Sequence, residues 1–346
     1  MTVLLWCGFV IFVVTMLAID LGVLNRKAHV VHAREALTWT GVCIVLALLF
    51  NVFVYFLYER QWFGVEPLPG GGLQAATEFF TGWLIEYSLS LDNIFVIALI
   101  FEYFRVPALY QHRVLFWGIL GALVMRGAMI GIGAWLVQFH FVLVLFGLIL
   151  IWSAVKMLRS GEEEIEPDRN PLVRLARRFF PVTPDYHDSR FFIRLPPAAG
   201  SNLPGRLAMT PLFIALLVVE ATDVLFAIDS IPAIFAITKV PFIVFTSNVF
   251  AILGLRSLYF ALAVLLRQFR YLKVSLAFIL AYVGSKMLAD AIFHYKIPAH
   301  VTLGVVAVIL SVGVLASILA RRSAVAHGAL RPHDDGASDR GPLGGA

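Results

Sequence analysis

The pattern of hydrophobic and polar positions along this chain consists of long apolar runs separated by shorter polar segments. Nine such runs cover residues 2–24, 36–58, 76–101, 110–136, 138–158, 208–237, 241–265, 273–290 and 299–320. Each run is long enough to cross the hydrocarbon of a bilayer as a helix, which takes ~20 apolar residues. We therefore expect an all-α, polytopic membrane protein with nine membrane-spanning helices.

Composition agrees with a membrane protein, and the distribution of charge predicts its orientation. The chain is 60% hydrophobic and 14% charged, which excludes an ordinary soluble domain. A net charge of +5 would suit a nucleic-acid partner, but 20 Lys and Arg residues lie in the tail and in the loops after the first, third, fifth and seventh runs, against three on the opposite side. This bias predicts an outside N-terminus, a cytoplasmic C-terminus and no nucleic-acid partner.

Two acidic stretches interrupt the apolar runs. They read EYSLSLDNIF at Glu86–Phe95 and EATDVLFAIDSIPAIF at Glu220–Phe235. A charged side chain at the bilayer centre costs about 3 kcal/mol even on the mildest insertion scales. Several carboxylates in two such segments therefore predict a protein-lined cavity and a path for a cation.

The two stretches align with each other, which indicates an internal repeat. Glu86 and Asp223 each stand six residues before an aspartate, Asp92 or Asp229, and the similarity continues to a Lys-Met-Leu sequence that ends each unit. Each unit holds three spans, an odd number, so the two units enter the membrane in opposite senses. We expect an inverted 3+3 repeat, an architecture in which transporters bind substrate near the midplane.

The repeat divides the chain into six segments. We expect two N-terminal membrane helices at 1–58, a first repeat at 76–158, a cytoplasmic linker at 159–207, a second repeat at 208–290, a last membrane helix at 299–320 and a disordered cytoplasmic tail at 321–346. The linker is rich in charge and is expected to be mostly solvated, with a short surface helix at Leu172–Phe180.

The polar side chains of the two stretches form a set of oxygen ligands. The candidates are Glu86, Asp92, Asn93, Glu220, Asp223, Asp229 and Ser230. Carboxylate, amide and hydroxyl oxygens suit Mn²⁺, Ca²⁺ or Mg²⁺ better than zinc or copper. On a regular helix Asp92 and Asp229 lie about 120° from the face of Glu86 or Asp223. Pro232 removes a helical hydrogen bond, so we expect a break beside Asp229 that turns backbone oxygen towards the ion.

The same acids have possible partners among cations inside the predicted spans. These cations are Arg126, Lys156, Arg256 and Lys286. Asp20, at the end of the first span, is a secondary candidate among the acids. The candidate acids exceed the cations by two charges, which a divalent ion or protonation would balance. Purely structural ion pairing stays as an alternative to a cation or proton path.

With these motifs the chain resembles the TerC family of integral membrane proteins, including its Alx branch. The resemblance covers residues 10–320 and rests on IDLGV, REAL, SLSLDNIFV, VLFWGILGALVMRG, TDVLFAIDSIPAIFAI and TSNVFAILGLRSLYF. That family is associated with manganese export and with tellurium-resistance gene clusters. The resemblance implies manganese efflux across a bacterial inner membrane, along a path formed by Glu86, Asp92, Asn93, Asp223 and Asp229.

Other functions stay open at this point. The protein could support the metallation of exported proteins near the secretion machinery, act in tellurium resistance, or export a different solute in exchange for protons. An enzyme is disfavoured, because the sequence has no Ser-His-Asp set, His-rich metal motif or nucleotide-binding glycine loop. We expect no prosthetic group. Mn²⁺ or Ca²⁺ is the expected substrate, and the bilayer and protons are the other expected partners.

Overall fold

The computed structural model describes residues 3–19, 33–159, 171–195, 207–262, 272–293, 295 and 297–326, and this part of the chain is almost entirely helical. The side chains of Asp92 and Arg256 are not described, although their backbone is. The helices are α1 (Val3–Ile19), α2 (Ala33–Glu59), η2 (Trp62–Gly64), α3 (Gly71–Tyr103), α4 (Ala108–Leu136), α5 (His140–Arg159), α6 (Pro171–Phe179), α7 (Pro211–Phe235), α8 (Pro241–Leu253), α9 (Leu255–Leu262), α10 (Leu272–Phe293) and α11 (Ala299–Ala326).

In the described residues, eight helical segments are long and apolar enough to cross a membrane. They coincide with the second to ninth predicted runs. The first run forms α1, which is shorter, with 17 residues. One predicted span is divided into α8 and α9 at Gly254, and α11 continues to Ala326, past its predicted end at residue 320. The architecture is that of a polytopic, α-helical membrane protein.

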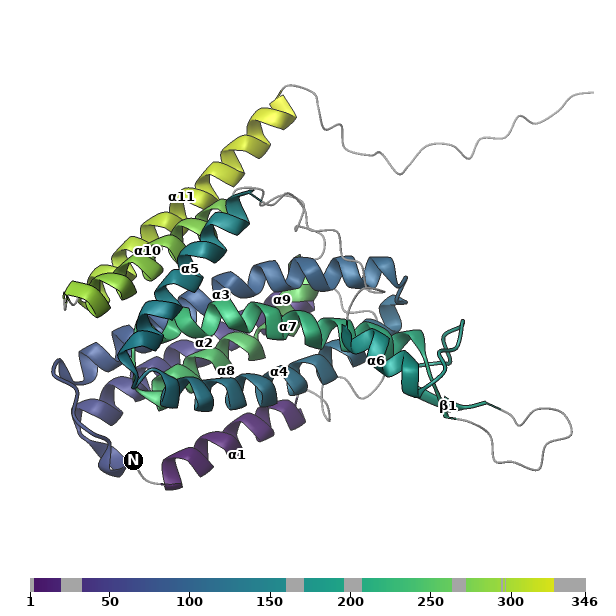
Figure 1. Ribbon diagram of the computed structural model, residues 1–346, viewed down its shortest axis with the longest axis horizontal. Coiled ribbons are helices and arrows are strands. Elements are labelled where there is room, and N and C mark those ends of the chain that lie inside the picture. The colour runs from purple at the N-terminus through teal and green to yellow at the C-terminus, as the bar shows by residue number, and fades with distance from the viewer. Residues whose placement is uncertain are drawn as a thin grey trace, which may run out of the picture.

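The acidic stretches lie on α3 and α7, at the centre of the bundle. Both α3 and α4 pack against α7, and both also pack against α8. A second group, formed by α5, α10 and α11, is inclined to these central helices (Figure 1). Within it, α5 and α10 make the most extensive helix contact in the described part of the chain. Polar side chains on the facing sides of α3, α4, α7 and α8 are therefore shielded by other helices.

An aromatic core fixes α3 against α2 and α8. Phe50 of α2 lies between two other rings, with centroid distances of 5.4 Å to Phe79 and 4.7 Å to Phe250. Phe79, on α3, and Phe242, at the start of α8, are fully buried. This packing holds the first half of α3 beside α8, so that the polar residues one or two turns further along both helices face each other.

Part of the predicted linker packs against the membrane helices. Its β1 (Phe192–Arg194) pairs in antiparallel fashion with β2 (Leu207–Met209), which adds a small sheet to the predicted all-α fold. The Tyr186 hydroxyl donates to the carbonyl of Phe104 at 2.6 Å, and Arg113 donates to Ser189 at 2.8 Å. The helix α6 lies where the sequence predicts one. The described part of the linker therefore covers the end of α3 and the start of α4 and is not simply solvated.

Pro232 does not break α7. The helix runs without interruption from Pro211 to Phe235, with Pro232 inside it, so the predicted break beside Asp229 is wrong. Proline removes one hydrogen bond, but its fixed φ suits a helix. It also lies in the last turn of α7, where every residue from Ser230 to Phe235 is buried. Packing of that turn holds the helical geometry.

Gly284→Ala should destabilise the protein where α5 and α10 cross. An added Cβ would lie 2.9 Å from the carbonyl oxygen of Gly147 and 2.9 Å from Cβ of Leu150, neither of which is a flexible group. Overpacking of this kind costs about 1–3 kcal/mol. The measurement is the thermal unfolding midpoint in detergent. Gly131→Ala is the control, because nothing lies within 4 Å of its added Cβ. Equal midpoints for the two variants would contradict the close crossing.

Candidate functional site

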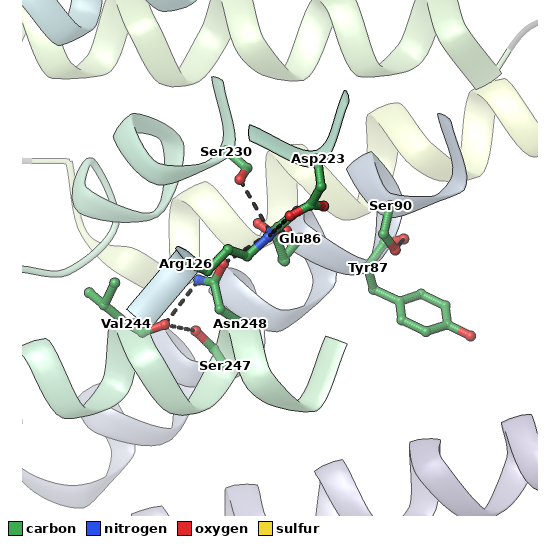
Figure 2. A network of polar contacts seen from close by, with 9 residues as sticks. All are labelled: Glu86, Tyr87, Ser90, Arg126, Asp223, Ser230, Val244, Ser247 and Asn248. Atoms are coloured by element: carbon green, nitrogen blue, oxygen red, sulfur yellow. Dashed lines mark hydrogen bonds and ion pairs between the residues drawn. The ribbon is translucent and has the colours of Figure 1, made fainter. Parts of the chain in front are cut away.

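Arg126 lies at the centre of a buried polar cluster (Figure 2). Its guanidinium, from α4, forms ion pairs with Glu86 of α3 and Asp223 of α7. The pairing with Asp223 is bidentate: Nη2 donates to Oδ1 at 3.0 Å, and Nε donates to Oδ2 at 3.3 Å. Arg126 and Glu86 are each only 2% exposed. Three helices thus bring two carboxylates and one guanidinium together inside the bundle, with Arg126 and Glu86 buried and Asp223 partly exposed.

Two neutral side chains complete the Arg126 cluster. Nη1 of Arg126 donates to Oγ of Ser230 and to Oδ1 of Asn248, each at 3.4 Å. The Asn248 amide nitrogen donates to the carbonyl of Val244 at 2.9 Å, which turns its oxygen towards Arg126 (Figure 2). Glu86, Asp223 and Ser230 were expected as metal ligands, and here they surround a cation supplied by the protein itself.

A pocket lies beside Asp223, between α3, α4, α7 and α9. Its polar lining consists of Asn93, Thr222 and Asp223, and the rest of the lining is apolar. Glu220 stands one turn before Asp223, and its carboxylate lies against Gly121 of α4. Its Oε2 is buried and has no hydrogen-bond partner among the described residues. A third carboxylate therefore lies close to the Arg126 cluster without a guanidinium of its own.

Asp229 does not join the Arg126 cluster. Its Oδ1 accepts a hydrogen bond of 2.6 Å from Ser153 of α5. The cation that acts on it electrostatically is Lys156, also on α5. Because α7 is continuous, six residues separate Asp229 from the face of Asp223 by about 120°. The structure therefore directs these two aspartates towards different neighbouring helices.

The remaining candidates lie elsewhere or outside the described residues. Lys286 donates from Nζ to the Thr302 hydroxyl of α11 at 2.9 Å, and the acids that act on it are Glu78 and Asp290, not those of the Arg126 cluster. Asp20 lies outside the described residues, as do the side chains of Asp92 and Arg256. The predicted roles of these three residues, as acids or cations of the candidate site, therefore stay predictions.

Comparison with known proteins places the chain in a family. The model of the integral membrane protein TerC family matches residues 72–325, a range that extends from α3 to α11. The chain belongs to the TerC family. An uncharacterized membrane protein of Myxococcus xanthus is 50% identical over 322 residues, which are 92% of this chain and 93% of that protein.

Two further relatives are similar over nearly their whole length. A protein of Escherichia coli strain K12, named "Putative membrane-bound redox modulator Alx", is 45% identical over 308 residues, 88% of this chain and 91% of its own length. An uncharacterized membrane protein of Rickettsia bellii is 38% identical over 316 residues, 91% of this chain and 97% of its own length. No solved structure matches the chain. These matches agree that this chain is an integral, multi-pass membrane protein of the TerC family.

Two polar partners in this TerC family protein were missed by sequence reasoning. Asn248 ends a run of three polar residues, Thr246 to Asn248, inside the otherwise apolar α8, and that run was a usable signal. No such signal pointed to Ser153, because the hydroxyl of a single serine in an apolar helix most simply forms a hydrogen bond within its own helix. Its role as the partner of Asp229 follows only from the packing of α5 on α7.

The region around Arg126 in this TerC family member carries more negative than positive side chains. Glu86, Asp223 and Glu220 supply three carboxylates to the region and Arg126 supplies one positive charge. Within the described residues, no group of three or more His, Cys, Asp or Glu side chains is arranged to hold a metal ion. A metal at this place would therefore need neutral oxygens such as that of Asn93, together with movement of the Arg126 guanidinium.

Proposed function

We propose that this TerC family protein exports divalent cations, with manganese as the first candidate and calcium as the second. The observation that carries the proposal is the buried Arg126 cluster, in which Glu86 and Asp223 lie near the middle of two membrane helices. With Glu220 ionised as well, three carboxylates and one guanidinium leave two negative charges, which one divalent cation balances. The oxygen donors suit Mn²⁺ and Ca²⁺.

Arg126 acts in this proposal as a tethered cation that the metal displaces. Without metal, its guanidinium pairs with both Glu86 and Asp223, whose charges would otherwise be more costly in the apolar interior. When a metal binds the carboxylates, Ser230 and Asn248 keep the guanidinium hydrogen-bonded, because both already accept from Nη1. The positive charge therefore moves a short distance and does not become buried without a partner.

The packing supports access to the Arg126 cluster from one side at a time. The pocket beside Asp223 reaches the second half of α3, at Asn93 and Ile97. The first half of α3 is closed by the packing of Ile85 with Ile231 and Ile234 of α7. We propose that an inverted 3+3 repeat exchanges these two states. In such a repeat α3 corresponds to α7 and α4 to α8, and α3 packs on α8 as α4 packs on α7.

We also propose the orientation that the Lys and Arg bias predicts, in a bacterial inner membrane with the N-terminus outside and the C-terminus in the cytoplasm. The second half of α3 then faces the cytoplasm, so the pocket is the side from which an exported ion enters. Protons are the proposed exchange partner, since protonation is the other way to neutralise the surplus carboxylates. The protein is proposed to be a transporter without a prosthetic group and not an enzyme.

Expression of the protein should lower cellular manganese and protect cells from manganese excess, with little effect on zinc or copper. The reason is the all-oxygen donor set, which gives softer metals no preferred ligand. The measurement is total cellular metal content in cells that lack, contain or overproduce the protein, followed by Mn²⁺ flux in proteoliposomes. Equal protection against zinc would contradict the ligand argument. No change in any metal would instead favour a role in the metallation of exported proteins.

A further inference from the structure

A second buried charge cluster lies on α3, α10 and α11, apart from Arg126. Glu78 of α3 is 5% exposed and Lys286 of α10 is 8% exposed. Gln74 donates from Nε2 to Oε1 of Glu78 at 2.7 Å. The other oxygen of Glu78, Oε2, is buried without a hydrogen-bond partner of good geometry in the described residues, although the Thr238 hydroxyl lies beside the carboxylate.

Lys286 is held at a distance from Glu78. Its Nζ donates to the Thr302 hydroxyl of α11 at 2.9 Å. The charges of Lys286 and Glu78 act on each other electrostatically, but these two described side chains form no direct ion pair. Arg126, in contrast, forms direct ion pairs with Glu86 and Asp223. A buried pair that only stabilises the fold gains most from direct contact. The separation leaves an oxygen of Glu78 open to another cation.

This second cluster lies beyond the apolar residues that close the Arg126 cluster. Glu78 precedes Glu86 by eight residues on the same helix, or ~12 Å along its axis. Between the two acids, Gly82 of α3 lies against Ile234 of α7, which belongs to the same buried apolar cluster as Ile85. Gln74 is half-buried and stands one turn closer to the start of α3. The cluster thus extends from the closed region towards the end of the bundle that the proposed orientation places outside.

We propose that Glu78 and Thr238 form an exit site for the exported divalent cation, in which Gln74 orients the Glu78 carboxylate. Lys286 is the tethered cation that displaces the ion. This inference rests on the proposed export function. A nearby ammonium group weakens metal binding by repulsion, which suits a site that must release its ion. Thr302 holds the ammonium aside, and after release Lys286 balances Glu78, so that the carboxylate is not left alone in the apolar interior.

The exit site has an acid in the first repeat only. This asymmetry is expected of a site that acts on one side of the membrane, where the exported ion leaves. Glu86 aligns with Asp223, and by the same offset Glu78 aligns with Ala215, which has no side-chain oxygen. Asp290, one turn after Lys286, is the other acid that acts on that lysine. It is half-buried and supplies a matched acid outside the exit site.

The decisive experiment combines metal binding with transport for three variants. Lys286→Met should create a second Mn²⁺ binding event in the purified protein and slow Mn²⁺ flux in proteoliposomes, because nothing then displaces the ion. Glu78→Gln should leave one binding event and lower the flux about 10- to 100-fold, the range seen when a group supporting a metal site is removed. Asp290→Asn, the control, should keep both the binding and the flux of the wild type.

The outcomes separate this inference from the function on which it rests. Wild-type protein that neither binds nor moves Mn²⁺ would overturn the export function. Wild-type transport with an unchanged flux in Glu78→Gln, or a Lys286→Met variant without a second binding event, would overturn the exit site alone. If Lys286→Met does not fold, the double variant Glu78→Gln/Lys286→Met decides, because it does not leave the Glu78 carboxylate without its cation. Normal flux in the double variant contradicts the proposal, and reduced flux supports it.

Discussion

Arg126→Met should sharply lower the amount of folded protein recovered from the membrane. The substitution leaves Glu86 and Asp223 facing each other in the interior without the guanidinium that pairs with both. Removing one partner of a buried ion pair costs about 3–5 kcal/mol, a large part of the stability of most proteins. The measurements are the monodisperse fraction after detergent extraction and the thermal unfolding midpoint.

Two further variants identify the cause of that loss. Glu86→Gln/Arg126→Met/Asp223→Asn removes all three charges with little change in shape, so it should recover most of the folded yield while transporting nothing. Arg126→Lys keeps the charge but cannot form the bidentate pair with Asp223. We expect a midpoint between those of wild type and Arg126→Met. A stable Arg126→Met protein would show that Glu86 and Asp223 do not depend on the guanidinium.

The membrane architecture could be predicted from the sequence because lipid imposes a strong, local requirement on composition. Runs of about 20 apolar residues are visible without knowledge of the fold. The boundaries were less predictable, because α11 continues past the predicted end of its span to Ala326 and Gly254 separates α8 from α9. Neither feature changes the apolar pattern. The packing of the linker against Phe104 and Arg113 was equally invisible, since its contacts come from residues far apart in the chain.

The membership of the Arg126 cluster could be predicted only in part. Helical periodicity correctly puts Asp229 about 120° from Asp223. The expected helix break beside Asp229, which was to turn backbone oxygen towards the ion, was wrong, because buried neighbours keep the last turn of α7 helical. The sequence also could not say which helix packs on that other face. Ser153 and Lys156 of α5 occupy it and give Asp229 its own partners.

Repeat symmetry was also an incomplete guide to the partners of the cations. Lys156 and Lys286 end the two repeats at equivalent positions, and the alignment gives no reason to treat them differently. In the structure Lys156 acts on Asp229 of α7, whereas Lys286 acts on Glu78, an acid outside both aligned motifs. In the proposed repeat, corresponding helices share their packing partners but not every side chain. An asymmetric charge is therefore a useful pointer to a function that only one half performs.

Asp223→Asn should abolish Mn²⁺ transport, and Asp229→Asn should not. Asp223 shares Arg126 with Glu86 and lines the pocket. Its loss therefore removes a proposed metal ligand and leaves Glu86 as the one described carboxylate of the cluster paired with Arg126. We expect the flux in proteoliposomes to fall about 100-fold, the upper end of the range for damage to a metal site. Asp229→Asn keeps an oxygen that can accept from Ser153, so the contact with α5 survives.

The pair of substitutions is informative because both change one carboxylate to an amide on the same helix, six residues apart. Any general effect of losing a charge from α7 appears in both variants, and only the difference reports on the Arg126 cluster. Folded yield and unfolding midpoint must be measured for each, since Asp223→Asn also weakens the pairing of Arg126. Loss of transport in Asp229→Asn with normal transport in Asp223→Asn would move the cation path from Arg126 to the contact between α5 and α7.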